Sequence, residues 1–332
     1  MTGAGTFNAQ PGATSSLIEE IAAQNPANPF YTPEYFAFWH TSGFTPWILS
    51  NGDTETKVYC PAFLKKGRLR CSLEIPSIPA IPADEPFWGG LIDFCRQRGV
   101  TDLSVNSFCS KGGVIPALPW EKIRKLRWEY VLHLKHPEFL KQMSKGHAYR
   151  VKRARKAGVE IRRGRDREAV EAHARLISAS MERRQKRGEN VTTEVPVDTL
   201  RRLIDSGAAE VFQAILGGKV VSSNFILLAK KAGYSHTLGS SLEGMDCGAA
   251  HFLIHEIAWT LRDEGKELLN LGGTDDPNPE SGLVKFKTGF GKATEKIELE
   301  AARFVPGGVA RSFFRRLFLS GKRYFVFPQA IT

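Results

Sequence analysis

Residues 282–291, which read GLVKFKTGFG, contain the pattern in this sequence that is best suited to chemistry. Lys287 lies between Phe286 and Phe290, and aromatic neighbours partly strip a cation of water, so its charge acts strongly on a nearby anion. Such a lysine suits a developing oxyanion or a phosphate, and we expect Phe286 to line the same site. The alternative is that both phenylalanines are buried anchors while the lysine extends to solvent.

The elements before this motif would position it. Residues 267–273 (ELLNLGG) alternate like a half-buried strand and end in Gly272 and Gly273. Two glycines let the backbone turn freely or approach a ligand closely, so we expect both to contact substrate. A polar loop, TDDPNPES, then leads to the lysine motif.

Length and composition set the class of protein. A chain of 332 residues is long for one core, which favours two domains, and 42% hydrophobic with 24% charged residues is typical of a soluble globular protein. No apolar run approaches the roughly 18 to 20 residues that span a bilayer, and no signal pattern opens the sequence, so we expect a cytoplasmic protein. Five scattered cysteines without a CxxC pair predict neither a disulfide framework nor a zinc site.

Charge is distributed unevenly along the chain. Residues 1–126 hold equal numbers of basic and acidic side chains, so the whole net charge of +11 lies in residues 127–332. This step predicts a domain boundary near Leu126 and a polyanionic partner for the second half, such as a tRNA, a nucleotide cofactor or a membrane surface. Residues 141–165 hold ten Lys or Arg against one acid, in helical rows that could follow a phosphate backbone. The alternative is a solvated basic surface.

The two halves repeat one order of elements. Each has three strand-like runs, then a helix, a glycine and a further strand. The segments are 46–50, 57–64, 69–75, 87–98 and 101–106 in one half, and 209–216, 220–228, 232–238, 249–263 and 267–271 in the other. An internal duplication is the economical explanation.

This order, followed by the double glycine, the polar loop and GLVKFKTGFG, resembles the FemAB family, whose members contain two copies of the GNAT acyltransferase fold. KGHAYRVKRARKAGVEI at 145–161 is similar to that family's basic helix and following strand. The resemblance implies an α+β protein of two GNAT-like domains, each a mixed, mostly antiparallel sheet flanked by helices. The expected parts are a disordered or helical tail (1–26), a degenerate first domain (27–126), a second domain carrying the site (127–308), and an amphipathic helix and tail (309–332).

The resemblance also implies an activity, the transfer of an acyl or aminoacyl group to an amine. The donor would be acyl-CoA or aminoacyl-tRNA, with no tightly bound cofactor. The acceptor would be a peptide, a lipid-linked precursor or a small amine, in cell-envelope precursor (peptidoglycan) or polysaccharide metabolism. The family's Phe-Lys lysine falls on Lys287, where it faces the donor and the tetrahedral intermediate. This chain has neither an inserted coiled-coil arm nor the RxxGxG/A signature of acyl-CoA enzymes, so the donor stays open.

Amide formation needs two kinds of group. Charge builds on the attacked carbonyl oxygen, and Lys287 is the cation expected to stabilise it. The ammonium formed by the attack must lose a proton, and Asp275 and Asp276 are the nearest carboxylates in sequence. Acids in a polar loop are, alternatively, only solvated or capping residues.

Four further residues are candidates. A helix expected at 166–187 carries an apolar face that continues to Arg184, which could meet a substrate carboxylate or phosphate, or pair with a neighbouring acid. His236, on the last strand of the second meander, could point into the cleft or be a satisfied sheet histidine. Gly248 and Ala249 open an apolar helix whose N–H groups could bind a cofactor pyrophosphate.

Two further patterns bear on function. His251 and His255 lie four apart with Glu256 beside them, but the zincin pattern needs a histidine at position 259, where Trp259 stands, so no metal site is predicted. Residues 309–327 are amphipathic and basic, which predicts either docking on the domain or peripheral contact with the inner membrane face. An alternative function is a non-catalytic GNAT-fold relative that binds RNA or a membrane through the basic half.

Overall fold

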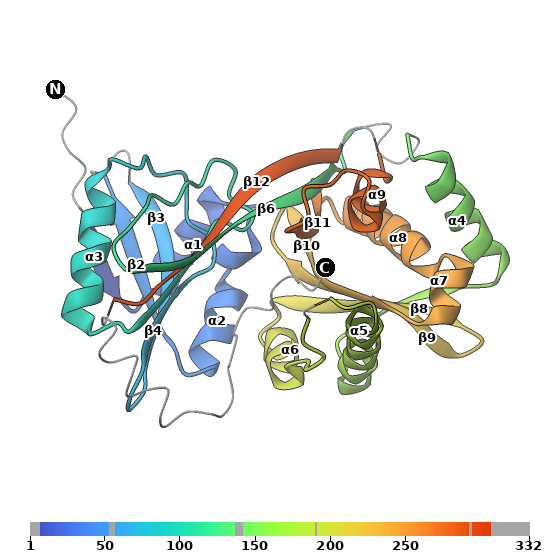
Figure 1. Ribbon diagram of the computed structural model, residues 1–332, viewed down its shortest axis with the longest axis horizontal. Helices are drawn as coiled ribbons and strands as arrows, with labels where there is room; N and C mark the ends of the chain where they lie inside the picture. The colour runs from blue at the N-terminus through green and yellow to red at the C-terminus, as the bar shows by residue number, and fades with distance from the viewer. Residues whose placement is uncertain (1–6, 53–56, 137–141, 190, 292–293, 307–332) are drawn as a thin grey trace. The chain divides into compact units, whose positions relative to one another are not determined.

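The computed structural model describes residues 7–52, 57–136, 142–189, 191–291 and 294–306, and the segment 309–332 therefore lies outside the described residues (Figure 1). The described chain forms two compact units. Of the described residues, unit 1 takes those within 7–25, 30–127 and 298–306, and unit 2 takes those within 26–29 and 128–297.

The sheet of unit 1 has the strand order β1-β2-β3-β4-β5-β12. The first four strands are antiparallel neighbours, β4 and β5 are parallel, and β12 returns antiparallel to β5. The strands are β1 (Asn8–Pro11), β2 (Thr45–Asn51), β3 (Val58–Lys66), β4 (Cys71–Ile75), β5 (Asp102–Asn106) and β12 (Thr294–Phe304). β1 thus lies in the range expected to be disordered or helical, where it pairs with β2.

Helices cover the sheet of unit 1. On α3 (Pro86–Arg98), Phe87 and Leu91 enter one core, and Gly99 ends the helix in the left-handed conformation. A short 3-10 helix (Pro29–Tyr31) and α2 (Pro33–Thr41) form an aromatic cluster in which Trp39 stacks on Phe63 with ring centroids 4.7 Å apart. α1 (Ser15–Gln24) contacts α2.

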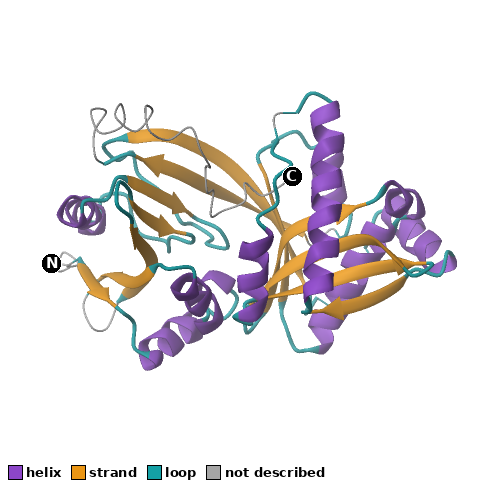
Figure 2. Ribbon diagram, turned by 90° about the horizontal axis from the view of Figure 1, so that it is seen from below, coloured by secondary structure: helices purple, strands orange, loops and turns teal. Residues whose placement is uncertain are grey.

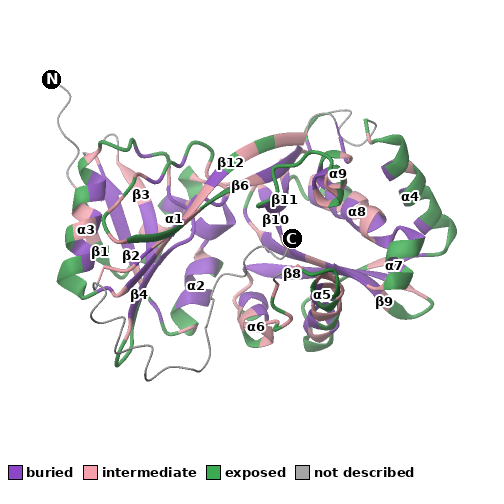
Figure 3. Cartoon of the chain, viewed as in Figure 1, coloured by how far each residue is buried: buried purple, intermediate pink, exposed green. Residues whose placement is uncertain are grey.

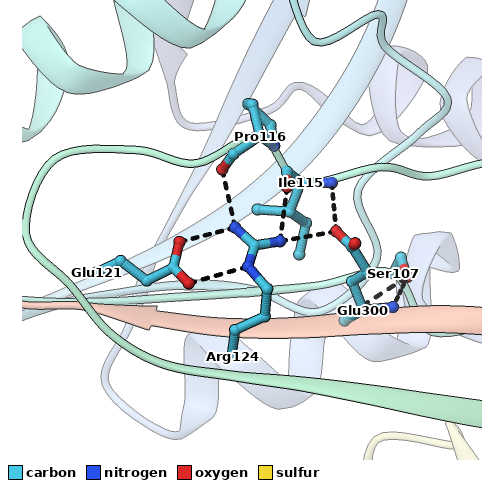
Figure 4. A network of polar contacts seen from close by, with 6 residues as sticks. All are labelled: Ser107, Ile115, Pro116, Glu121, Arg124 and Glu300. Atoms are coloured by element: carbon cyan, nitrogen blue, oxygen red, sulfur yellow. Dashed lines mark hydrogen bonds and ion pairs between the residues drawn. The ribbon is translucent and has the colours of Figure 1, made fainter.

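A polar network fixes the loop that follows β5 (Figure 4). Arg124, near the start of β6 (Glu121–His133), donates to the carbonyls of Ile115 and Pro116 at 2.7 and 3.0 Å. The same guanidinium pairs with Glu121 and with Glu300 of β12. Because Glu300 also accepts the Ile115 N–H at 2.8 Å, the loop is bound to both strands.

The sheet of unit 2 has the order β6-β11-β10-β9-β8-β7, which repeats the pattern of unit 1. β7 to β10 are antiparallel neighbours, β10 and β11 are parallel, and β6 is antiparallel to β11. The strands are β7 (Glu160–Gly164), β8 (Ala209–Leu216), β9 (Lys219–Leu228), β10 (Ala232–Ser240) and β11 (Leu268–Thr274). The last strand of each unit is contributed out of order: β6 follows β5 in the chain but pairs with β11, and β12 follows β11 but pairs with β5. Because most of β12 belongs to unit 1, unit 2 ends at Ile297, whereas the expected second domain was 127–308.

Helices lie on both faces of the unit 2 sheet (Figures 1 and 2). One face carries α4 (Lys145–Lys156), α7 (Leu242–Cys247), α8 (Ala249–Asp263) and α9 (Gly282–Thr288), and the other carries α5 (Arg167–Lys186) and α6 (Val197–Asp205). The strands are mostly buried while the outer sides of the helices are exposed (Figure 3). The mostly antiparallel strands of each unit, flanked by helices, confirm the expected fold class.

Candidate functional site

The parallel pairing of β10 with β11 stops in the middle of the unit 2 sheet. Residues Ala232 to Tyr234 pair with Leu268 to Asn270, and beyond that point β10 bulges at Ser235 while β11 bulges against β6. A strand edge released from its neighbour presents N–H and C=O groups that can bind an extended ligand. The end of the β10–β11 ladder therefore marks a candidate donor site.

The corresponding point in unit 1 is filled by the protein itself. β4 and β5 stay paired to Ile75, and the chains bridge again between Ser77 and Ser107. The Tyr31 hydroxyl donates to the Ser77 carbonyl at 2.7 Å, and the Ser77 hydroxyl donates to the Phe108 carbonyl at 2.6 Å. In unit 1 these contacts occupy the position that corresponds to the end of the β10–β11 ladder in unit 2.

Gly272 occupies the bulge of β11. Its φ of +75° is a left-handed conformation, and a Cβ at this position would lie 2.6 Å from the Ser235 carbonyl oxygen of β10. The close approach expected for the glycine pair is thus an approach to β10. One expectation was wrong: the pair does not end the strand, because β11 continues to Thr274, with Gly272 in its bulge and Gly273 paired with Glu129 of β6.

Lys287 is buried against this bulge. It lies on α9, which begins after Ser281, whose hydroxyl accepts the Val284 N–H. The side chain is 6% exposed, and Nζ donates to the Leu271 carbonyl at 2.5 Å. The alternative in which the lysine extends to solvent is therefore excluded.

Two histidines that the sequence did not single out for this motif complete its surroundings. His147 of α4 and His251 of α8 pack edge to face with ring centroids 4.6 Å apart, and both contact the rings of Phe286 and Phe290. His147 Nε2 donates to the Phe286 carbonyl at 2.8 Å, which leaves Nδ1 to accept from Ser144. The helical spacing of the buried residues 147, 151 and 154 was a signal that could have found His147.

Gly289 of the motif has a packing reason. A Cβ on Gly289 would lie 2.1 Å from the His147 ring, so only glycine lets α4 approach the end of α9. The Ser144 N–H donates to the Gly289 carbonyl at 2.9 Å and joins the same two segments. The position of α9, and with it Lys287, depends on these contacts.

Burial keeps these histidines neutral. Desolvation lowers the pKa of His251 to about 3, with a further contribution from the neighbouring His147, and desolvation also lowers the pKa of His147. The unfolded chain binds the protons that the folded chain excludes, so stability falls as pH drops below the ordinary histidine pKa of about 6.5. The loss attributable to His251 continues down to pH about 3, where the folded protein also binds the proton.

We therefore expect His251→Phe to flatten the dependence of stability on pH. Phenylalanine keeps the aromatic packing and removes a group that costs up to about 1.4 kcal/mol per pH unit in this window. Urea unfolding midpoints of both proteins between pH 6.5 and 4.5 measure the effect, with His40→Phe at an exposed position of α2 as the control. Equal slopes for the wild type and His251→Phe would contradict it.

Arg184 and His236 lie toward the other face of the sheet. Arg184 Nε, near the end of α5, donates to Glu189 at 2.6 Å, which is the pairing weighed as the alternative. His236 lies in the β10 bulge with its ring 6.0 Å from Phe225, and burial lowers its pKa to about 4. Phe225 in turn contacts His173 of α5, so His236 lies toward that helix and not toward α9.

The remaining candidates have defined places. Asp275 and Asp276 are exposed in the loop after β11, and Asp276 accepts the Asn278 N–H at 2.9 Å. Gly248 and Ala249 open α8 as expected, but a Cβ on Gly248 would lie 2.7 Å from the Arg150 carbonyl of α4. The glycine at 248 is therefore needed for the close packing of α4, and the pyrophosphate-binding role of both residues stays a prediction.

The outer side of α4 is strongly basic. Its exposed side chains include Tyr149, which is 64% exposed, beside Lys145, Lys152 and Arg153 at helical spacing. An exposed aromatic ring among cations is typical of surfaces that stack a base while holding the phosphate backbone.

Among the described residues, no group of three His, Cys, Asp or Glu side chains could hold a metal ion. Nor is any of the described helices both long and apolar enough to cross a bilayer.

Comparison with known proteins agrees with this architecture. Residues 141–283 match the family described as acetyltransferase (GNAT) domain, and no curated protein sequence matches the chain. The fold is similar to that of FemX, with a TM-score of 0.62 at 14% identity over 93% of this chain and 99% of that one. A tandem GNAT protein from the clavulanic acid biosynthesis pathway gives 0.52 at 11% identity, covering 91% and 99% of the two chains. L-PGS from Bacillus licheniformis gives 0.50 at 12% identity, covering 93% and 98%. The expected likeness to tandem GNAT proteins is confirmed.

Proposed function

We propose that this chain, whose residues 141–283 match the acetyltransferase (GNAT) domain family, transfers an acyl or aminoacyl group from an activated donor to an amine and so forms an amide. One observation carries the proposal. The buried Lys287 ammonium lies on the Leu271 carbonyl, beside the Gly272 bulge that follows the end of the parallel ladder of β10 and β11. A cation at the point where a donor carbonyl could enter between two strands suits stabilisation of an oxyanion.

The reaction follows from this arrangement. The donor lies along the released edge of β10, and the neutral acceptor amine attacks its carbonyl carbon. A C–N bond forms and negative charge develops on the carbonyl oxygen near Lys287. The C=O bond then re-forms as the C–S or C–O bond breaks, and the leaving thiolate or alkoxide takes up a proton from solvent. The proton lost by the nitrogen passes to solvent or to a carboxylate, for which Asp275 and Asp276 remain the proposed candidates.

Substrate contacts remain proposals too. Gly272 and Gly273 would bring the backbone of β11 close to the donor, and Phe286 would line its path. Arg184 and His236, which lie toward the α5 face, would have to bind a part of the acceptor that reaches beyond the sheet.

Both donor types are retained. The match to an acetyltransferase domain supports acyl-CoA, and the basic α4 surface with exposed Tyr149 supports aminoacyl-tRNA. The acceptor would be a peptide, a lipid-linked precursor or a small amine, as in cell-envelope metabolism.

Incubation with labelled acetyl-CoA and, separately, labelled aminoacyl-tRNA distinguishes the donors. Label is expected to move to an amine from one of them. If tRNA is the donor, a Lys152→Ser, Arg153→Ser, Lys156→Ser variant of α4 should raise the apparent KM for tRNA about tenfold or more, because each lost phosphate contact weakens binding. The same variant should leave transfer from acetyl-CoA unchanged.

The two negative outcomes are distinct. Absence of transfer from either donor to a panel of peptide, lipid-linked and small amines would overturn the proposed function. Retained tRNA binding without transfer would instead favour the alternative, a non-catalytic relative that binds RNA through α4.

A further inference from the structure

A fully buried carboxylate lies on the strand next to the bulge. Glu129 of β6 has no exposed surface. Its Oε1 accepts the Tyr234 hydroxyl of β10 at 3.0 Å, and its Oε2 accepts the Asn270 amide of β11 at 2.7 Å. Burying a charge costs free energy unless hydrogen bonds satisfy it, so the presence of a carboxylate at this buried position calls for a structural reason.

Asn270 links Glu129 to the bulge through hydrogen bonds to both. With its Nδ2 directed at Glu129, its Oδ1 accepts the Gly272 N–H at 2.8 Å. Gly272 carries the left-handed φ of +75° and follows Leu271, whose carbonyl accepts from Lys287. One continuous connection therefore runs from the carboxylate through Asn270 and the Leu271–Gly272 backbone to the ammonium.

We propose that Glu129 is a positioning residue, which through Asn270 holds the Leu271–Gly272 backbone in the conformation that seats the Lys287 ammonium. Glu129 is not the general base, since its side chain is enclosed and both of its oxygens accept hydrogen bonds from the protein. The proposal rests on the proposed function only for its effect on transfer. Its effect on Lys287 can be measured without any substrate.

The orientation of Asn270 makes a reciprocal test available. Asn270→Asp keeps an oxygen for the Gly272 N–H but turns a second oxygen toward Glu129, so two acceptors face each other without a donor. Adding Glu129→Gln supplies an amide N–H between the two side chains and leaves an oxygen for Tyr234. The double variant restores both the hydrogen bonds and the single negative charge.

Competitive acetylation with trace acetic anhydride reports on Lys287 in the full-length protein. Labelling of Lys287 is measured by peptide mass spectrometry relative to Lys285, which is exposed on the same helix. We expect Lys287 to be labelled more slowly than Lys285 in the wild type. The ratio should rise about tenfold or more in Asn270→Asp, as loss of a charge-assisted hydrogen bond allows, and return toward the wild-type value in the double variant.

Tyr234→Phe is the matched control. It removes one hydrogen bond to the same carboxylate but leaves the Asn270 connection intact, so it should lower the urea unfolding midpoint without changing Lys287 labelling. Equal effects of Tyr234→Phe and Asn270→Asp on labelling would mean that Glu129 contributes only to general stability, and they would overturn the proposal. So would a double variant no closer to wild type than Asn270→Asp.

Failure here and failure of the proposed function can be told apart. The positioning role is supported, and the transferase is not, if the Lys287 labelling ratio rises in Asn270→Asp and returns in the double variant of a protein that transfers no acyl group. Active transfer in a protein whose Lys287 labelling is unchanged in all three variants supports the transferase and counts against the positioning role.

Discussion

Lys287→Met is expected to slow transfer about a hundredfold in kcat, with a much smaller change in the KM for the donor. Methionine has a similar length and keeps the apolar packing, so the substitution removes the charge and the hydrogen bond to Leu271. Loss of one group that stabilises an oxyanion typically lowers kcat by about a hundredfold to a thousandfold. Steady-state kinetics with the donor identified by labelling measures the effect.

Lys285→Met provides the control within α9. Lys285 is exposed and pairs with Glu280 at 2.7 Å, so its replacement removes an equal charge from the same helix without touching the bulge. Its kcat should stay within about twofold of the wild type, as the small energy of a surface ion pair predicts. An unchanged kcat in Lys287→Met, or an equal loss in both variants, would remove the oxyanion role from Lys287.

The sequence predicted the elements of this site better than their relation in space. Periodicity and turn residues placed α8 and β11 to within a few residues, because those features act locally. Lys287 was recognisable because a lysine flanked by phenylalanines is chemically unusual. That its amine would lie on the Leu271 carbonyl was not, because that contact depends on how α9 packs against β11.

The missed residues share a cause. Glu129, Asn270 and His147 come from three separate elements, and each looks ordinary in its own segment. The sequence offered Arg184 and His236 as candidates without indicating which face of the sheet each takes, and both lie toward α5. Which face a strand residue takes after a bulge, as at His236, is set by the register with β9 and cannot be counted from alternation alone.

Gly272→Ala is expected to abolish most transfer and to destabilise β11. Alanine would pay for the left-handed φ, at about 1 to 3 kcal/mol, and its Cβ would also lie 2.6 Å from the Ser235 carbonyl. Because that neighbour is backbone, relief requires β10 and β11 to move apart, which shifts the Leu271 carbonyl away from Lys287. Hydrogen exchange of residues 268–274 measures the local loss, alongside kcat.

Gly265→Ala separates the cost of the left-handed φ from the effect of the contact with the Ser235 carbonyl. Gly265 has a nearly identical φ of +77° after α8, but a Cβ there meets nothing within 4 Å, so the substitution carries the backbone cost alone. It should lower stability by about 1 kcal/mol while kcat stays near the wild-type value. If Gly272→Ala behaved like Gly265→Ala in both measurements, the contact with Ser235 would not be what fixes the bulge. The placement of Lys287 would then have to depend on the packing of α9 against His147 and Phe290 instead.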